Sequence, residues 1–185
     1  MSESETEPRL LVFETNIGWV GVMHHDQVLQ RVRLGFDNLL DAALAFKSDC
    51  VGPSDPNAWE KKLIARIKSS LSHDAAKSKS KFGFDDIDID LSDLTEFQLK
   101  VVKAVRALGF GETASYGEVA DQVGHPGAAR AVGTVMKKNR FPLIVPCHRV
   151  LAASGIGGFT SPRGVGTKRD LLEIEGHQLG AESKM

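Results

Sequence analysis

Cysteine is scarce in this sequence, and no long hydrophobic run occurs. Only Cys50 and Cys147 are present among 185 residues, so no disulfide framework is expected and both thiols would stay free in a reducing compartment. No apolar run approaches the length needed to cross a bilayer, and the opening MSESETEPR lacks the layout of a secretory signal. We therefore expect no membrane association and a cytoplasmic or nuclear protein, in which a thiol is available as a nucleophile.

Net charge is also small, at −1, but it is unevenly distributed. Residues 1–94 carry 11 Lys and Arg against 16 Asp and Glu, whereas residues 95–177 carry 11 against 7. A modest positive excess is often only a solvated surface. The second half is nevertheless the part that could face phosphates.

Hydrophobic patterns in the first half predict a small sheet with helices. β-branched and apolar residues separated by short turns indicate an antiparallel meander. Apolar residues at helical spacing indicate two helices that cover one face of this sheet. A strict alternation of apolar and polar residues indicates a further strand. The predicted strands are 9–15, 18–24, 27–34 and 87–91, and the predicted helices are 37–46 and 58–71.

Helix signals are sharper in the second half. Thr95 with Gln98 and Ser115 with Glu118 show the reciprocal N-capping pattern, and the helix after Ser115 should stop near residue 124. Pro126 suits the first turn of a third helix that runs to residue 138. Two short helices joined by a tight turn resemble a helix-turn-helix. Small residues in the third helix favour either close approach to a partner or tight helix packing.

These patterns predict an α/β (α+β) protein in two parts. After an acidic tail at residues 1–8, an α/β domain with a small antiparallel sheet should cover 9–92. A mainly helical C-terminal domain, with a winged-helix-like helix-turn-helix, should cover 93–180.

The strongest chemical signal is Pro-Cys-His-Arg, which interrupts an apolar stretch, RFPLIVPCHRVL. A lone cysteine in apolar surroundings is usually an inert core residue. Here His148 and Arg149 follow directly, and a basic environment would favour the nucleophilic thiolate of Cys147. Because neighbours in an extended chain point to opposite sides, His148 would act through a water molecule or a local turn.

The motif P-C-H-R-V is preceded by A-A-R-A-V-G and S-Y-G-E and followed by L-L-x-x-E-G-H. In this order and near this spacing, the motifs resemble those of the O6-alkylguanine-DNA alkyltransferase family, the methylated-DNA-protein-cysteine methyltransferases. The resemblance runs from about residue 96 to 179, whereas the first ninety residues match only in architecture.

The resemblance implies DNA repair by irreversible, single-turnover transfer of an alkyl group from O6-alkylguanine, with O4-alkylthymine as a further candidate. Cys147 would accept the alkyl group, His148 would take its proton through a water molecule, and Glu175 would orient that histidine. Tyr116 would sit beside the flipped base and give a proton to the guanine. No cofactor is implied.

The implied partner is double-stranded DNA, bound through its minor groove by a monomer. Arg130 would fill the space left by the flipped nucleotide. Asn139 would bridge the helix-turn-helix to the active-site loop, and the backbone of Val150, with that of Cys147, would read the guanine edge. The remaining implied residues are Ala128, Ala129, Ala131, Gly133 and Thr134 on the DNA-binding helix, and Pro142, Phe159 and Thr160 at the pocket.

The sequence departs from the family in the loop GGFTSPRGVG, where many members have a tyrosine, a serine and paired glycines. Phe159 supplies no hydroxyl, although Thr160 keeps its backbone N–H. Some relatives hold a structural zinc in the first domain, but the candidate ligands here match no compact zinc pattern, so no metal is expected. Those candidates are Cys50, His24, His25 and His73.

Three other functions remain as alternatives. A non-catalytic lesion sensor would flip alkylguanine without transfer, but relatives of that kind have tryptophan in place of the cysteine. A cysteine hydrolase using Cys147 and His148 would turn over repeatedly and without DNA. A helix-turn-helix regulator would read bases in the major groove with polar side chains, whereas the third helix here is mostly Ala, Gly and Val.

Overall fold

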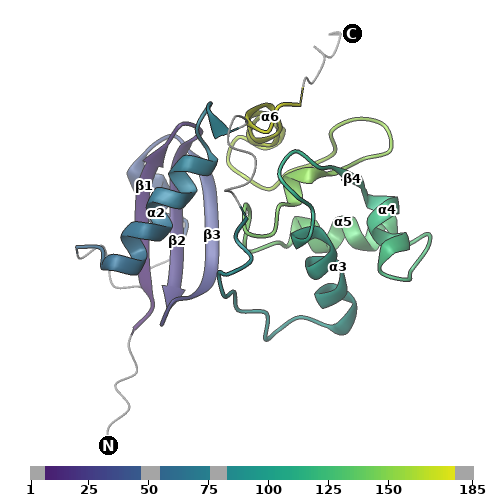
Figure 1. Cartoon of the computed structure of the whole chain (residues 1–185), viewed down its shortest axis with the longest axis horizontal. Coiled ribbons are helices and arrows are strands. Elements are labelled where there is room, and N and C mark those ends of the chain that lie inside the picture. The colour runs from purple at the N-terminus through teal and green to yellow at the C-terminus, as the bar shows by residue number, and fades with distance from the viewer. Residues whose placement is uncertain (1–6, 47–54, 76–82, 178–185) are drawn as a thin grey trace, which may run out of the picture.

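The computed structural model describes residues 7–46, 55–75 and 83–177 (Figure 1). Its mixture of a small antiparallel sheet with helices confirms the α/β (α+β) class expected from the sequence. The elements, in chain order, are β1 (Arg9–Thr15), β2 (Gly18–His25), β3 (Val28–Phe36), α1 (Leu39–Leu44), α2 (Ala58–Ser70), α3 (Glu96–Arg106), β4 (Ala114–Ser115), α4 (Tyr116–Gln122), α5 (Ala129–Lys137), the 3₁₀ turn η2 (Cys147–Arg149), β5 (Val150–Leu151) and α6 (Val165–Ile174).

The first three strands form an antiparallel sheet in the order β1-β2-β3, which confirms the predicted meander. Thr15 pairs with Gly18 next to the first turn, and the β1 register continues to Arg9 opposite His24. β3 continues two residues beyond its predicted end, to Phe36. Leu11 and Phe13 of β1 and Val20 and Val22 of β2 lie two positions apart on their strands, and all four enter the core.

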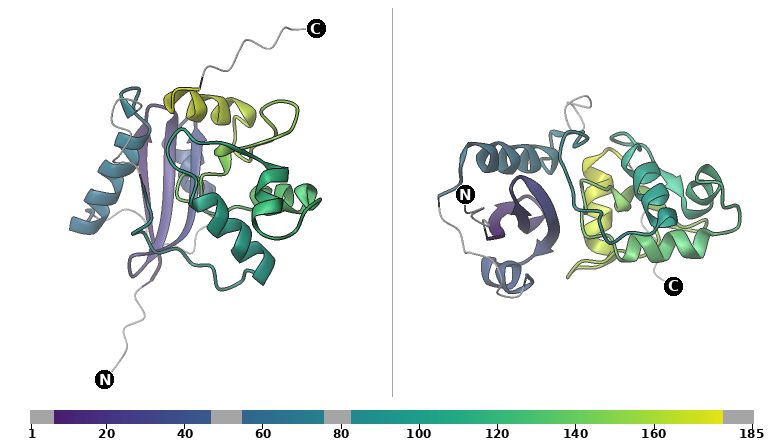
Figure 2. Two further views of the ribbon diagram at one scale, coloured as in Figure 1. Left: turned by 45° about the vertical axis from the view of Figure 1, so that its right-hand side comes forward. Right: turned by 90° about the horizontal axis from the view of Figure 1, so that it is seen from below.

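The helices α1 and α2 lie on opposite faces of this sheet, so the prediction that both cover one face is wrong (Figure 2). Lys68 of α2 lies over the ring of Phe13, which is paired with Val20 on the same face. Phe46, just after α1, packs against Gly21, where an added Cβ would lie 2.3 Å from the ring. Adjacent residues of a strand point to opposite faces, which separates the two helices.

The predicted strand at residues 87–91 is also wrong. Only Ile89 forms a bridge, to Leu29 of β3. The carbonyl of Ile87 instead accepts a hydrogen bond from the Arg106 guanidinium at 2.6 Å. The Arg106 side chain therefore satisfies a backbone carbonyl that a neighbouring strand would otherwise have to satisfy. The segment runs as an irregular connection between α2 and α3.

Both predicted capping boxes are present in the C-terminal half. Thr95 and Gln98 cap the N-terminus of α3, and Ser115 and Glu118 cap that of α4. In each pair, the side chain of each residue bonds to the backbone N–H of the other. These four residues account for the positions at which the two helices begin.

The third helix begins later than predicted. α5 starts at Ala129, and Pro126 lies outside it. Gly127 has a φ of +83°, which is incompatible with a right-handed helix and ends the preceding turn. Ala128 at the N-cap position makes no side-chain cap hydrogen bond. The turn between α4 and α5 is therefore longer than the sequence pattern indicated.

β3 and α6 join the sheet to the C-terminal half. The backbone N–H of Val32 donates to the carbonyl of Arg140 at 2.7 Å. Gly35 has a φ of +81°, and an added Cβ would lie 2.7 Å from the Thr167 hydroxyl oxygen of α6. Seen from below, α6 lies between the sheet and the helices α3 to α5 (Figure 2).

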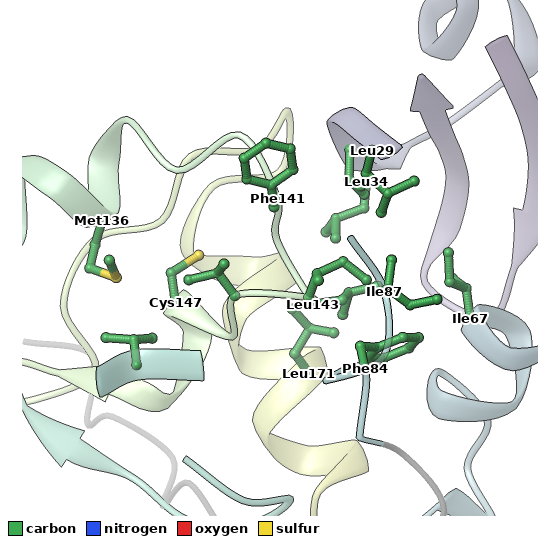
Figure 3. Close-up of a cluster of buried hydrophobic side chains, with 14 of the residues drawn as sticks. Leu29, Leu34, Ile67, Phe84, Ile87, Met136, Phe141, Leu143, Cys147 and Leu171 are labelled. Carbon is green, nitrogen blue, oxygen red and sulfur yellow. The ribbon is translucent and has the colours of Figure 1, made fainter. Parts of the chain in front are cut away.

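One hydrophobic cluster runs from the sheet to the Pro-Cys-His-Arg segment (Figure 3). It begins at Leu29 and Leu34 of β3 and passes through Leu143 in the centre of the view. Cys147 lies at its far end, beside Met136 of α5. Close packing of this kind holds side chains in single positions, so the core itself places the cysteine.

Within the described ranges, no helix has the length and apolarity that crossing a bilayer requires. Nor do any three His, Cys, Asp or Glu side chains of those ranges gather into a group that could hold a metal ion. Cys50, a zinc candidate in the sequence, lies outside the described residues.

Candidate active site

The segment before Cys147 is held by Asn139, which lies two residues after the end of α5. The Asn139 side-chain amide donates to the carbonyl of Val145 at 2.9 Å, and its oxygen accepts from the backbone N–H of Phe141 at 3.0 Å. The backbone N–H of Cys147 donates to the same Val145 carbonyl at 2.7 Å. Asn139 thus connects the helix-turn-helix to the cysteine segment, at the position the resemblance implied.

Cys147 is 7% exposed and lies on the wall of a cavity of about 430 Å³. Pockets of a few hundred cubic ångströms are typical of small-molecule sites. Tyr116, Gly133, Phe159 and Thr160 line the cavity and had been named from the sequence. Met136, Lys137 and Gly158 line it as well and had not.

The Cys147 thiol is not made acidic by its surroundings, contrary to the expectation drawn from its basic neighbours. Burial raises its pKa, and the opposing influences of the Asn139 side chain, the Lys168 charge and nearby backbone N–H groups do not cancel this effect. Arg149 does not help, because its guanidinium is engaged by Glu175. The thiol therefore needs a base to remove its proton.

A buried His–Glu pair lies directly after Cys147 in the chain and at the start of the C-terminal segment. His148 is 1% exposed, and its Nε2 lies 2.8 Å from Glu175 Oε1. Glu175 also accepts hydrogen bonds from Arg149 Nη2 at 2.7 Å and from the backbone N–H of Gly111 at 3.1 Å. Burial alone would raise the pKa of Glu175, but the bonds from His148 and Arg149 lower it to about 2. The carboxylate is ionised at neutral pH.

The hydrogen bond to Glu175 also sets the tautomer of His148. Burial lowers the pKa of His148 despite the carboxylate beside it, so the ring is neutral near pH 7. An ionised carboxylate can only accept, so Nε2 carries the ring proton. The buried Nδ1 has no hydrogen-bond partner in the described structure and keeps its lone pair. A proton acceptor is thus available next to Cys147 in the chain.

Lys168 of α6 is a further charged residue at this site, which the sequence reasoning missed. It is fully buried, and its Nζ donates to the carbonyls of Val150 at 2.6 Å and Gly158 at 3.4 Å. Burial lowers its pKa to about 8, and Cys147 acts in the opposite direction. Lys168 forms no ion pair with any carboxylate in the described ranges. Its charge therefore favours a thiolate at Cys147.

A signal for Lys168 was present in the sequence. It stands three, four and seven positions before Leu171, Leu172 and Glu175, on the stripe that α6 turns inward. A lysine on the apolar stripe of a helix is rarely fully buried unless it has a specific role.

Tyr116, the first residue of α4, is half-buried between α5 and the loop after the cysteine. An added Cβ at Gly157 would lie 3.4 Å from its hydroxyl oxygen, and one at Gly133 would lie 3.9 Å from its ring. Its ring centre is 5.9 Å from Lys168 Nζ. Burial, and then the charge of Cys147, raise the pKa of Tyr116, so the phenol stays protonated.

Pro142 and Val150, both named for the pocket from the sequence, lie outside the lining of the Cys147 cavity. Pro142 lines a neighbouring cavity and not the one that contains Cys147. Val150 is buried, its carbonyl accepts from Lys168, and its backbone N–H donates to the carbonyl of Cys147. The Val150 carbonyl keeps a second lone pair, so its contact with the guanine edge stays a prediction.

The outer face of α5 carries the residues named for DNA. Arg130, Ala131 and Thr134 are exposed, and Ala128 and Ala129 are half-buried. The Thr134 hydroxyl donates to the carbonyl of Arg130 at 3.0 Å, so its hydrogen is used within the helix. The face is therefore smooth between two exposed cations, Arg130 and Lys137.

Comparison with known proteins finds a match to one family. Residues 96–177 match the family model described as 6-O-methylguanine DNA methyltransferase, DNA binding domain. A methylated-DNA–protein-cysteine methyltransferase of Mycobacterium tuberculosis is 49% identical over 98 residues, which are 52% of this chain and 58% of that protein. The aligned part is thus somewhat more than half of that relative.

Solved structures extend the match to nearly the whole chain. The crystal structure of the Mycobacterium tuberculosis O6-methylguanine methyltransferase has a TM-score of 0.73 and 33% identity, covering 95% of this chain and 96% of that one. The structure of Mycobacterium tuberculosis OGT in complex with DNA has a TM-score of 0.70 and 30% identity, covering 90% and 92%.

Proposed function

The chain belongs to the O6-methylguanine DNA methyltransferase family, and on this premise we propose that it repairs DNA by moving an alkyl group from O6 of guanine to Cys147. The observation that carries the proposal is the placement of the thiol. Cys147 lines a cavity and is followed by a histidine whose Nδ1 is unpaired and whose Nε2 is held by an ionised glutamate. Such an arrangement generates a nucleophile near neutral pH.

The transfer forms one S–C bond and breaks one C–O bond. The Cys147 proton passes through a water molecule to His148 Nδ1, and the sulfur attacks the alkyl carbon in line with O6. The electron pair of the C–O bond stays on guanine, which takes a proton from the Tyr116 hydroxyl. Tyr116 is reprotonated as His148 releases its proton, so no acid or base is consumed. Lys168 stabilises the sulfur while it is anionic.

DNA is the partner that brings the alkylated base to this cavity. A base in a duplex is out of reach of a buried thiol, so it must be flipped out. The smooth face of α5 suits the minor groove, and the exposed Arg130 would occupy the space that the base leaves. O4-alkylthymine, whose alkyl group is also carried by an exocyclic oxygen, is a second candidate substrate.

The reaction occurs once per protein molecule. A thioether is not hydrolysed by water as an acyl-enzyme is, so the thiol is not regenerated. An alkyl group added to a residue that is 7% exposed also disturbs a packed site and lowers the stability of the product.

We place this reaction in a reducing compartment, the bacterial cytoplasm or a nucleus, because a lone reactive thiol must stay reduced.

Intact mass measurement tests the proposal directly. Incubation with O6-methylguanine duplex should add one methyl group per molecule, and peptide mapping should locate it on Cys147 and not on Cys50. Cys147→Ala should bind the duplex and gain no mass. If the wild type binds the modified duplex without a mass change, the chain is a lesion sensor and the transfer is ruled out. Repeated turnover on an ester without DNA would instead identify a cysteine hydrolase.

A further inference from the structure

A second and larger cavity opens beside the one that contains Cys147. Its volume is about 590 Å³, and it lies between β3, the loop that follows α5 and residues 160–162. Lys137 and Thr160 line both cavities, and the Thr160 hydroxyl donates to the Lys137 carbonyl at 3.2 Å. The two cavities therefore share a border. We call the larger one the β3 groove.

Five cationic side chains line the β3 groove, and no carboxylate is found among the lining residues that the structure describes. Only Arg140 has an ion pair, with Asp93 at 2.6 Å. The other four cations form no ion pair with any residue of the described ranges. The five are Arg31, Arg33, Lys137, Lys138 and Arg140.

The fold forces two of these cations together. Arg31 and Arg33 are two positions apart on β3, opposite Met23 and Gly21 of β2, so they project from the same face of the sheet. Burial and the charge of Arg31 lower the pKa of Arg33. Clustered like charges without counterions favour an anionic ligand.

We propose that the β3 groove binds the phosphodiester backbone of the DNA whose alkylated base enters the Cys147 cavity. This inference rests on the proposed function. A nucleotide whose base occupies the smaller cavity carries phosphates at its mouth, and the groove begins at that mouth, at Lys137. Arg130 and Lys137 are seven residues apart on α5, about 10 Å along its axis. The DNA footprint thus runs from Arg130 along α5 to the sheet, and the N-terminal half contributes to binding.

Salt dependence of DNA binding tests the groove separately from the chemistry. The test variant is Arg31→Ala/Arg33→Ala, and the matched control is Lys61→Ala/Lys62→Ala, which removes two exposed cations from α2 on the opposite face of the sheet. Affinity for a methylated duplex of about 30 base pairs is measured from about 50 to 200 mM salt. Methyl transfer from the free base O6-methylguanine is measured in parallel.

Each phosphate contact adds about 0.9 to the slope of log affinity against log salt. Loss of two contacts should lower the slope by about 2, so the fall in affinity between about 50 and 200 mM salt should become about 10-fold smaller. The control should keep the wild-type slope, and all variants should keep the free-base rate. Arg31→Lys/Arg33→Lys should recover most of the slope, because it restores the charge.

The outcomes separate the two proposals. If Arg31→Ala/Arg33→Ala keeps the wild-type slope while the wild type binds and repairs DNA, the groove proposal is wrong and the proposed function stands. An equal slope decrease in the α2 control would also overturn the groove, because net charge alone would explain it. If the wild type transfers no alkyl group, the proposed function fails, whatever the variants do.

Discussion

Replacing Glu175 by glutamine should destabilise the protein by about 3 kcal/mol at neutral pH. The carboxylate accepts bonds from His148, from Arg149 and from the backbone of Gly111. Its pKa is lowered from 4.5 to about 2, and each pKa unit corresponds to about 1.4 kcal/mol. Glutamine retains the shape but leaves the buried Arg149 charge without a counterion.

The pH dependence of this loss has a defined sign. The pKa of Glu175 is about 2 in the folded protein and near its ordinary 4.5 in the unfolded chain, so its stabilisation is fully present above pH 4.5. It is lost as the pH falls from 4.5 towards 2, because the folded carboxylate then becomes protonated. The difference between wild type and Glu175→Gln should therefore shrink over this interval.

Urea unfolding of both proteins at several pH values measures the difference. Glu173→Gln is the control, since Glu173 is exposed on the same helix and should change stability by less than about 0.5 kcal/mol. A loss below about 1 kcal/mol at pH 7, or a loss that does not change between pH 4.5 and 2.5, would refute the role of Glu175 as an ionised anchor.

Four further variants test the other groups of the site. His148→Ala should slow single-turnover methyl transfer by about 10²- to 10⁴-fold, and a wild-type rate would remove it from the mechanism. Tyr116→Phe keeps the ring beside Gly157 but lacks the hydroxyl, so the transfer rate should fall about 10²-fold while duplex affinity is unchanged. Equal losses of rate and of affinity would show that the hydroxyl contributes to binding instead. For Lys168, a folded pKa of about 8 against an ordinary 10.5 means that the unfolded chain binds more protons between these values. Wild-type stability should therefore rise with pH over that interval. A rise of the same size in Lys168→Met would show that Lys168 is not its cause. Arg130→Ala should weaken repair of duplex more than transfer from the free base, and equal losses would contradict its role in flipping.

Local signals in the sequence were sufficient for much of the fold. The β-branched runs of β1 to β3 and the capping boxes at Thr95 and Ser115 involve residues a few positions apart, so their physics is contained in short segments. One error arose where a distant group competes with a local pattern, because the Arg106 side chain satisfies the carbonyl of Ile87 in the predicted strand. Another was local, because the positive φ of Gly127 delays the start of α5.

The sequence by itself determined the chemical candidates, because the order of Tyr116, Arg130, Cys147, His148 and Glu175 is a property of the chain. The domain limits and the roles of these residues remain predictions. Only the tertiary structure decided the electrostatics. Burial makes the thiol less acidic than its basic neighbours suggested, and α6 brings in Lys168 from 21 positions away. Desolvation and charge proximity depend on distances in space, which residue order does not contain.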